Sequence, residues 1–322
     1  MTSTSIPELF VRPLTHADYE GVVELLNRVY PARQTTIEQM HEANRERNPK
    51  CKTARWCALA DAVLIGYADY TQRITNHKPG NFQVNVVVDE AFRRRGVGSM
   101  LYQRLIDDLA EHKPEILRAD AYENLSAGLP FALKLGFKDV FREGPSHLDI
   151  ETFRADVFAP LLVKLEDEGI EFISLSAWQK QDADFAVKLF AAYCDAWEDV
   201  PKEEESPISW EDWQEWTLTK PQVDHNAYTL AVQGEDIVGF CEMGKAPEGL
   251  SLYAGLAGVA RSHRNKGIAT ALYVRAIGAA RQHGHPQIQT SSAIENIAMQ
   301  TVYSNLGFVR EPAWIQLEKR LK

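Results

Sequence analysis

The order of apolar and polar positions along the chain predicts strands that alternate with helices. Short apolar runs such as LFVRPLT (9–15) and LIGYADY (64–70) have the length and residue content of strands. The segment HADYEGVVELLNRVY (16–30) spaces its apolar residues three and four positions apart, which is the period of a helix. Because strands alternate with helices and also follow one another directly, the pattern predicts mixed α/β sheets flanked by helices.

The same order of elements occurs twice, which predicts a tandem duplication. The stretch AFRRRGVGSMLYQRL (91–105) aligns with SHRNKGIATALYVRA (262–276) at a shift of 171 residues. At the same shift, Leu-Gly-Phe at 135–137 falls on Leu-Gly-Phe at 306–308. The predicted organisation is a domain at 1–153, a linker at 154–169 that forms a packed helix, and a domain at 170–322.

Each copy of the repeat contains a loop suited to bind phosphate. The loop follows a buried strand, and its glycine opens an amphipathic helix. The first backbone N–H groups of a helix have no partner within it and carry the positive end of its dipole. Gly267 lets a ligand oxygen approach the backbone, and Arg264 and Lys266 add positive charge. These features predict a cradle for a phosphate or pyrophosphate. Neither a Walker loop nor a dinucleotide-binding fingerprint is present.

Both loops fit the signature Gln/Arg-x-x-Gly-x-Gly/Ala, and the chain resembles the GCN5-related N-acetyltransferase (GNAT) superfamily over nearly its whole length. The resemblance implies two tandem domains, each a mostly antiparallel sheet with a splayed parallel pair of strands. It further implies that the loop amides hold the pyrophosphate of acetyl-CoA, while the pantetheine arm fills the gap between the splayed strands.

By this resemblance, cofactor-binding residues occur in both halves, at the strand end, in the loop and in the first helical turn. In the first half they are Val88, Arg93, Arg94, Arg95, Gly96, Val97, Gly98 and Ser99. In the second half they are Val259, Arg264, Asn265, Lys266, Gly267, Ile268, Ala269, Thr270 and Asn296.

The resemblance also implies a catalytic tyrosine. Many members of the family carry a Tyr that protonates the departing thiolate, and Tyr303 stands at the matching distance before the second Leu-Gly-Phe. The matching position in the first half is Ala132, beside Phe131, and neither side chain carries a proton to donate. We therefore expect a catalytic C-terminal half and an N-terminal half that binds or supports. The alternative is that Tyr303 is a core aromatic.

Glu242, in a predicted strand, is the candidate general base. Strand alternation places Cys241 and Met243 on the opposite face. If Glu242 faces the cleft, burial would raise its pKa toward the range of a useful base. An edge position in solvent is the competing interpretation. Asp69 is the approximate counterpart in the first half.

Composition excludes several classes of protein. A formal net charge of −10 argues against a nucleic-acid binder. Four scattered cysteines without a CxxC pair predict neither a metal site nor disulfides, and favour the cytoplasm. No apolar run is long enough to cross a membrane, and the first ten residues do not resemble a secretory signal. The acidic stretch 182–205 is either a solvated surface or a rim that attracts a cationic amine.

Three tryptophans at a spacing of three, Trp210, Trp213 and Trp216, predict one face of a helix that belongs to the core or walls a cationic substrate. Together the observations predict an acetyl-CoA-dependent N-acetyltransferase that acts directly on a primary amine of a small cationic acceptor, as a monomer or homodimer. The alternatives are a non-catalytic acyl-CoA-binding sensor or partner module, and a transferase of a longer acyl group.

Overall fold

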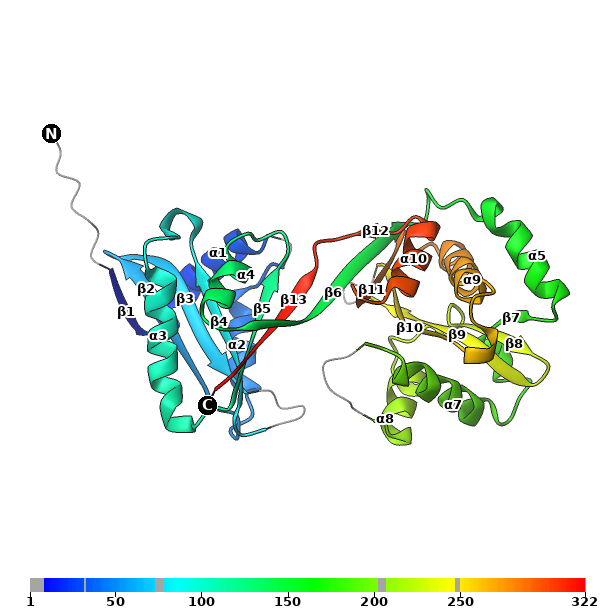
Figure 1. Ribbon diagram of the computed structural model, residues 1–322, viewed down its shortest axis with the longest axis horizontal. Coiled ribbons are helices and arrows are strands. Elements are labelled where there is room, and N and C mark those ends of the chain that lie inside the picture. Colours follow the sequence, from blue (N-terminus) through cyan, green and yellow to red (C-terminus); the bar gives the residue numbers. More distant parts are fainter. Residues whose placement is uncertain (1–8, 32, 73–77, 202–206, 247–249, 322) are drawn as a thin grey trace. The chain divides into compact units, whose positions relative to one another are not determined.

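The computed structural model describes residues 9–31, 33–72, 78–201, 207–246 and 250–321, so the start of the chain and residues 202–205 of the acidic stretch lie outside the described residues. The chain forms two compact units (Figure 1). The N-terminal unit comprises Met1–Ala121, Leu125–Val140 and Gln316–Lys322, and the C-terminal unit comprises Tyr122–Asn124 and Phe141–Ile315.

The N-terminal unit is a sheet with helices on both faces. On one face, Tyr67 and Val87 pack against the first two helices. On the other face, Gly66 lies against Leu101 of the third helix. The strands follow the order β1-β2-β3-β4-β5-β13. The elements are β1 (Leu9–Pro13), α1 (Tyr19–Val29), α2 (Ile37–Arg45), β2 (Thr53–Ala60), β3 (Val63–Thr71), β4 (Asn81–Val88), α3 (Val97–Leu109), β5 (Ile116–Tyr122), α4 (Gly128–Lys134) and β13 (Trp314–Arg320).

The C-terminal unit repeats this plan, with strand order β6-β11-β10-β9-β8-β7 and a short β12 paired with β6. Its helices also cover both faces of the sheet (Figure 1). The elements are β6 (Lys138–Asp149), α5 (Ala159–Asp167), β7 (Glu171–Ser174), α6 (Leu175–Trp178), α7 (Phe185–Glu198), α8 (Trp210–Gln214), β8 (Thr229–Gln233), β9 (Asp236–Lys245), β10 (Leu252–Val259), α9 (Ile268–Gln282), β11 (Gln287–Ala293), α10 (Ile297–Leu306) and β12 (Val309–Arg310).

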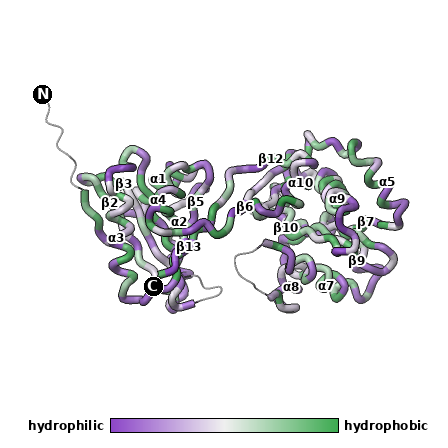
Figure 2. The backbone as a smooth tube through the Cα atoms, in the orientation of Figure 1, coloured by the Kyte–Doolittle hydropathy of each residue, from purple (hydrophilic) through white to green (hydrophobic). Residues whose placement is uncertain are grey.

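Helix amphipathicity explains how the layers form. Along α3 and α9, hydrophobic and hydrophilic positions alternate (Figure 2). The apolar side chains of α9 belong to the core of the C-terminal unit, in which Leu272, Tyr273 and Ala276 are fully buried. Burial of such a stripe, rather than helix propensity alone, stabilises a helix in a protein.

The compact units do not follow the two halves of the sequence. The predicted boundary at 153 places all of 138–149 in the first domain, but these residues form the single strand β6, which pairs with β11 of the C-terminal unit from Glu143 onward. Conversely, Gln316–Lys322 at the end of the chain belongs to the N-terminal unit, where β13 lies next to β5. Each half of the sequence therefore gives its last strand to the other unit.

The predicted linker is helical, as expected. A short 3-10 helix at Ala155–Phe158 precedes α5. Helix α5 packs on α9, where Leu161 and Leu162 join the core and Arg275 pairs with Glu166. The segment is therefore part of the C-terminal unit and not a flexible tether.

The exchanged strand provides a test of this architecture. Leu317 of β13 is 1% exposed, so we expect Leu317→Ala to destabilise the protein by about 2–4 kcal/mol through lost burial and a cavity. Hydrogen exchange should rise first in β5, in the N-terminal unit. Arg320→Ala, which removes a side chain that is 80% exposed, is the matched control and should leave exchange unchanged. If hydrogen exchange became faster only in the C-terminal unit, the placement of β13 in the N-terminal unit would be contradicted.

Candidate functional site

The two glycine loops have the same backbone conformation. Arg94 and Asn265 have φ of 63° and 64°, and Gly96 and Gly267 have φ of 88° and 91°. Helices α3 and α9 each begin at the residue that follows the glycine. Positive φ is uncommon outside glycine, so two such residues at matching positions in both loops mark a specific geometry. The predicted duplication therefore extends to the detailed shape of the loops.

The arginine of each signature closes its loop. The Arg93 Nε–H donates to the carbonyl of Val88 at 3.2 Å, and the Arg264 Nε–H donates to the carbonyl of Val259 at 3.0 Å. Each bond ties the loop to the last residue of the preceding strand. These arginines therefore shape the cradle, in addition to contributing charge.

The predicted contacts after each glycine lie in the first turns of α3 and α9. Val97 and Ile268 are buried, whereas Ser99 is exposed and Thr270 is partly exposed. The earliest α-helical bonds run from Met100 N to Gly96 O and from Ala271 N to Gly267 O. The N–H groups of the intervening residues have no partner within the helix, as an anion cradle requires.

Next to each loop, the parallel strand pair separates. The β4–β5 pairing ends at Gln83–Arg118, although β4 continues to Val88. The β10–β11 pairing ends at Ala254–Thr290, although β10 continues to Val259. The splayed pair implied by the family resemblance is thus present in both units. We call each opening a fork.

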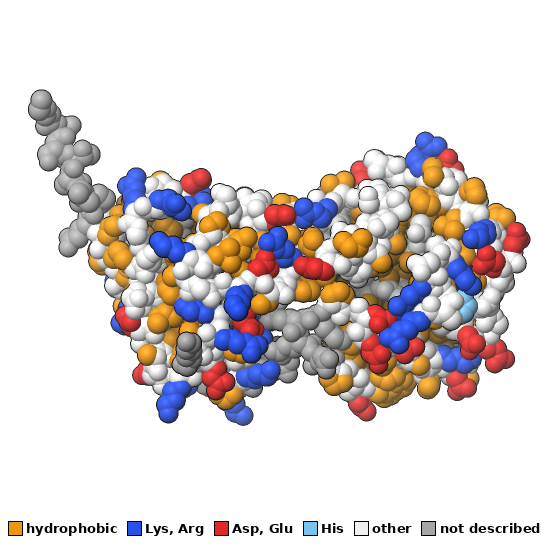
Figure 3. All heavy atoms as spheres, viewed as in Figure 1, with side chains coloured by type: hydrophobic (Ala, Val, Ile, Leu, Met, Phe, Trp, Pro, Cys, Tyr) orange, Lys and Arg blue, Asp and Glu red, His pale blue; other side chains and the backbone are white. Residues whose placement is uncertain are grey.

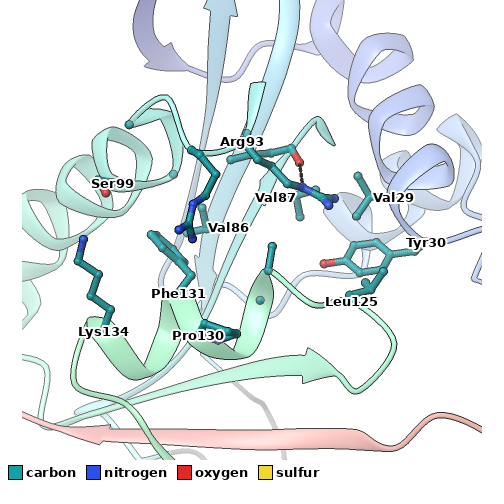
Figure 4. A pocket seen from close by; sticks show the side chains of 16 residues that line it. Val29, Tyr30, Val86, Val87, Arg93, Ser99, Leu125, Pro130, Phe131 and Lys134 are labelled. Carbon is teal, nitrogen blue, oxygen red and sulfur yellow. Dashed lines mark hydrogen bonds between the residues drawn. The ribbon is translucent and has the colours of Figure 1, made fainter. Parts of the chain in front are cut away.

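The fork of the N-terminal unit opens into a cavity of about 430 Å³. Its wall includes the end of β4, the glycine loop and α4, with Tyr30, Phe131 and Lys134 arranged around it (Figure 4). A Cβ at Gly96 would meet nothing within 4 Å. Several of the predicted contacts line this one cavity: Val88, Arg93, Arg94, Gly96, Gly98 and Ser99.

The loop of the C-terminal unit has a different neighbour. A Cβ at Gly267 would lie 2.7 Å from Leu161 Cδ1, so the absent side chain of this glycine makes room for α5. This packing role was not expected from the sequence, and the approach of a ligand oxygen to Gly267 stays a prediction. Asn296 also has a local role, because its Oδ1 accepts the Met299 N–H and caps α10.

Glu242 lies at the fork of the C-terminal unit, on the face covered by α7. Its neighbour Phe240 packs with α7, whereas Cys241 and Met243 face α9, as strand alternation predicts. Strand β10 bulges between Ala254 and Ala257, and there the Leu256 N–H donates to Glu242 Oε2 at 3.2 Å. Burial raises the pKa of Glu242, and the Leu256 N–H opposes this shift.

Tyr303 reaches the same fork from the opposite face. Its hydroxyl lies 3.1 Å from Thr290 Oγ1, in the last parallel pair, and Thr290 Oγ1 donates to the Ala254 carbonyl at 3.0 Å. Because the Thr290 hydroxyl has one proton, Tyr303 is the donor between the two. The Tyr273 hydroxyl donates to Tyr303 at 3.3 Å. A chain of hydroxyl groups therefore ends where the strands separate.

The Tyr303 side chain is more deeply buried than the sequence suggested. It is 4% exposed and packs with Tyr273 and Phe308 in the core, so it does not face an open cleft in this structure. Burial raises its pKa, and the hydrogen bond that it accepts from Tyr273 opposes this shift. The ring is therefore a core aromatic whose hydroxyl lies at the fork, and the catalytic role of Tyr303 stays a prediction.

The N-terminal unit places Asp69 in the position of Glu242. Asp69 pairs with Asn85 across β3 and β4, just beyond the end of the β4–β5 pairing. Burial raises the pKa of Asp69 to about 6, although hydrogen bonding with Tyr67 and the charge of Arg55 lower it. On α4, Phe131 contacts Gly98, and no tyrosine corresponds to Tyr303. The unit has a carboxylate but no matching acid.

The three tryptophans do not share one helix face. A π-helix at Glu215–Thr219 follows α8 directly and changes the periodicity. Trp213 is fully buried against Phe190, whereas Trp216 is 42% exposed. The core interpretation therefore holds for Trp213 and fails for Trp216.

Comparisons with known proteins agree with this geometry. The sequence pattern of the acetyltransferase (GNAT) family matches residues 19–137 and 186–308. Among solved structures, a GCN5-related N-acetyltransferase from Sphaerobacter thermophilus has a TM-score of 0.68 at 18% identity, covering 98% of this chain and 97% of that one. A tandem GNAT protein from the clavulanic acid biosynthesis pathway has a TM-score of 0.58 at 18% identity, covering 97% and 98%.

A GCN5-related glucosamine N-acetyltransferase region of a fungal multi-domain β-N-acetylglucosaminidase has a TM-score of 0.65 at 12% identity. It covers 98% of this chain, which spans 38% of that protein. At such identities the likeness concerns the fold, and no curated protein matches significantly. Among the described helices, none is both long and apolar enough to cross a bilayer. The two family matches, the paired loops and the two forks establish that the chain belongs to the GNAT acetyltransferase family, with two tandem domains of the fold that serves acyl-CoA-dependent acyl transfer.

Proposed function

We propose that this protein transfers an acetyl group from acetyl-CoA to a primary amine of a small cationic acceptor, and that the reaction takes place in the C-terminal unit. The observation that carries the proposal is the pair Glu242 and Tyr303, which reach one fork from opposite faces of the sheet. A thioester held in that fork would have a carboxylate on one side and a hydroxyl donor on the other.

The two side chains then have complementary roles. Glu242 accepts a proton from the ammonium form or from the attacking amine, because burial raises its pKa and so makes the carboxylate a stronger base. The amine nitrogen forms a bond to the carbonyl carbon as the carbon–sulfur bond breaks. Tyr303 gives its proton to the departing sulfur and regains one through its hydroxyl neighbours, of which Tyr273 is the nearest donor. Transfer is direct, without a covalent enzyme intermediate.

In this proposal, the N–H groups of residues 265–270 hold the cofactor phosphates in the C-terminal unit, and those of 94–99 hold them in the N-terminal unit. The open cavity beside Gly96 supports binding by the N-terminal unit. Because α4 carries Phe131 where a proton donor would be needed, we propose that this unit binds acyl-CoA without transferring the acyl group.

Charge and aromatic side chains support a cationic acceptor. On the face seen in Figure 3, basic side chains are interspersed with acidic ones. Helix α7, on the Glu242 side of the C-terminal sheet, carries the exposed acids Asp195 and Glu198. Trp216 offers a partly exposed ring, which a cation can contact. A small amine-bearing molecule fits this environment better than an anionic one.

Matched variants test the cofactor sites. Ser99 and Thr270 occupy equivalent positions in the first turns of α3 and α9. A glutamate there is compatible with the helix dipole but repels a bound phosphate. We expect wild-type protein to bind acetyl-CoA in calorimetry, and Ser99→Glu and Thr270→Glu each to remove one site. Gln substitutions at the same positions control for side-chain size. If wild-type protein binds no acetyl-CoA, the proposal fails.

Kinetics test the catalytic pair in an amine-acceptor screen. Tyr303→Phe should lower kcat about 100-fold and alter the alkaline limb of the pH profile, and Glu242→Gln should lower kcat/KM to a similar extent. Because the pKa of Glu242 is raised, wild-type activity should fall with decreasing pH earlier than for an ordinary glutamate, and Glu242→Gln should remove that acid limb.

Asp69→Asn is the comparison in the other unit. If it abolishes turnover while Glu242→Gln does not, the chemistry belongs to the N-terminal unit. Cofactor binding without transfer to any amine would favour a non-catalytic acyl-CoA sensor. A preference for a longer acyl-CoA over acetyl-CoA would favour a transferase of a longer acyl group.

A further inference from the structure

The helix ends that border the two phosphate loops carry opposite charges. In the N-terminal unit, the end of α1 lines the cavity through Val29 and Tyr30. Arg28 stands just before them in the last turn of α1, whereas the end of α7 carries Asp199 as its C-cap. The duplicated scaffold therefore presents a cation to one loop and an anion to the other.

Asp199 is bonded to the loop of the C-terminal unit. Its Oδ1 accepts from Arg261 Nη2 at 2.9 Å, and its Oδ2 accepts from Arg264 Nη2 at 2.5 Å. Hydrogen bonds from Arg261 and Arg264 lower the pKa of Asp199 to about 2, so the carboxylate is charged at any physiological pH. Arg264 is the arginine of the phosphate-binding signature.

The N-terminal loop has the reverse arrangement. Arg28 Nη2 pairs with Asp89 Oδ2 at 2.9 Å, and Asp89 precedes the loop. Arg93, the counterpart of Arg264, forms no ion pair with an acidic side chain among the described residues; its Nε–H bonds to the Val88 carbonyl. A phosphate therefore meets an uncompensated guanidinium in one unit and a compensated one in the other.

The position of Asp199 is unfavourable for helix stability. A helix C-terminus carries partial negative charge, which favours a cation such as Arg28 and disfavours a carboxylate. Asp199 is the C-cap of α7, so its ion pairs with the loop offset this repulsion. The Asp199 carboxylate therefore does not stabilise the helix that it caps. Its favourable contacts are the ion pairs with the arginines of the loop.

We propose that Asp199 is a built-in competitor for the phosphates of acyl-CoA, so that the C-terminal unit binds the cofactor more weakly than the N-terminal unit. Binding there requires Arg264 to exchange a carboxylate for a phosphate, which releases the end of α7. The inference rests on the proposed function of the two loops.

The experiment uses the full chain with Ser99→Glu, which leaves the C-terminal site alone to bind. CoA is titrated by calorimetry at low ionic strength. Asp199→Asn should tighten binding about two- to fivefold, the range expected for loss of an exposed ion pair. At about 1 M salt, where the Debye length is roughly 3 Å, the gain should disappear. Asp195→Asn is the matched control, because it removes the same charge one turn earlier on α7, where the carboxylate attracts Arg261 at longer range and, within the described part of the chain, forms no hydrogen bond with Arg264.

Each outcome has a distinct meaning. Unchanged binding in Asp199→Asn, or an equal gain in Asp195→Asn, overturns the competitor role. Weaker binding in Asp199→Asn also overturns it, because Asp199 would then position Arg264 for phosphate. In each of these three cases the proposed function survives, since CoA still binds. Failure of CoA to bind wild-type protein overturns the proposed function together with this inference.

Discussion

Both units depend on a parallel strand pair that separates after three residue pairs. Backbone N–H and C=O groups on the separated segments need hydrogen-bond partners, and a long polar molecule with amide groups can provide them. The loop that follows begins a helix, whose first N–H groups attract an anion at one end of the same opening. In the proposed function, backbone groups therefore recognise most of the cofactor and the arginine of the loop adds charge, which explains why a single glycine and a single arginine suffice as a sequence signature.

Because the backbone supplies recognition, side chains around it could diverge between the units. The C-terminal fork has Glu242 and Tyr303, while the N-terminal fork has Asp69 and a phenylalanine on α4. The two forks therefore share a geometry but differ in whether a tyrosine hydroxyl is present. In the proposed function, recognition and chemistry are separable, and duplication allows one copy to keep the first while losing part of the second.

Sequence patterns predicted the features that local physics determines. The glycine that opens each loop helix was read from the two repeated motifs, and the face of Glu242 follows from strand alternation. The exchange of β6 and β13 was not predictable, because hydrophobic period does not specify which distant strand is the partner. Contact between Leu161 and Gly267 likewise depends on how a linker helix packs. The π-helix after α8 altered a spacing that assumed ordinary helical turns.

The exchange of strands also sets an order of events during synthesis. Strand β5 leaves the ribosome almost two hundred residues before its neighbour Gln316–Arg320. At about 5–20 residues per second, the β5 edge waits roughly ten to forty seconds for the strand that covers it. Until then the N-terminal unit has an unpaired edge, which in other proteins invites pairing with a second chain. The last residues of the chain therefore complete the first unit, so neither half of the sequence is a self-sufficient folding unit.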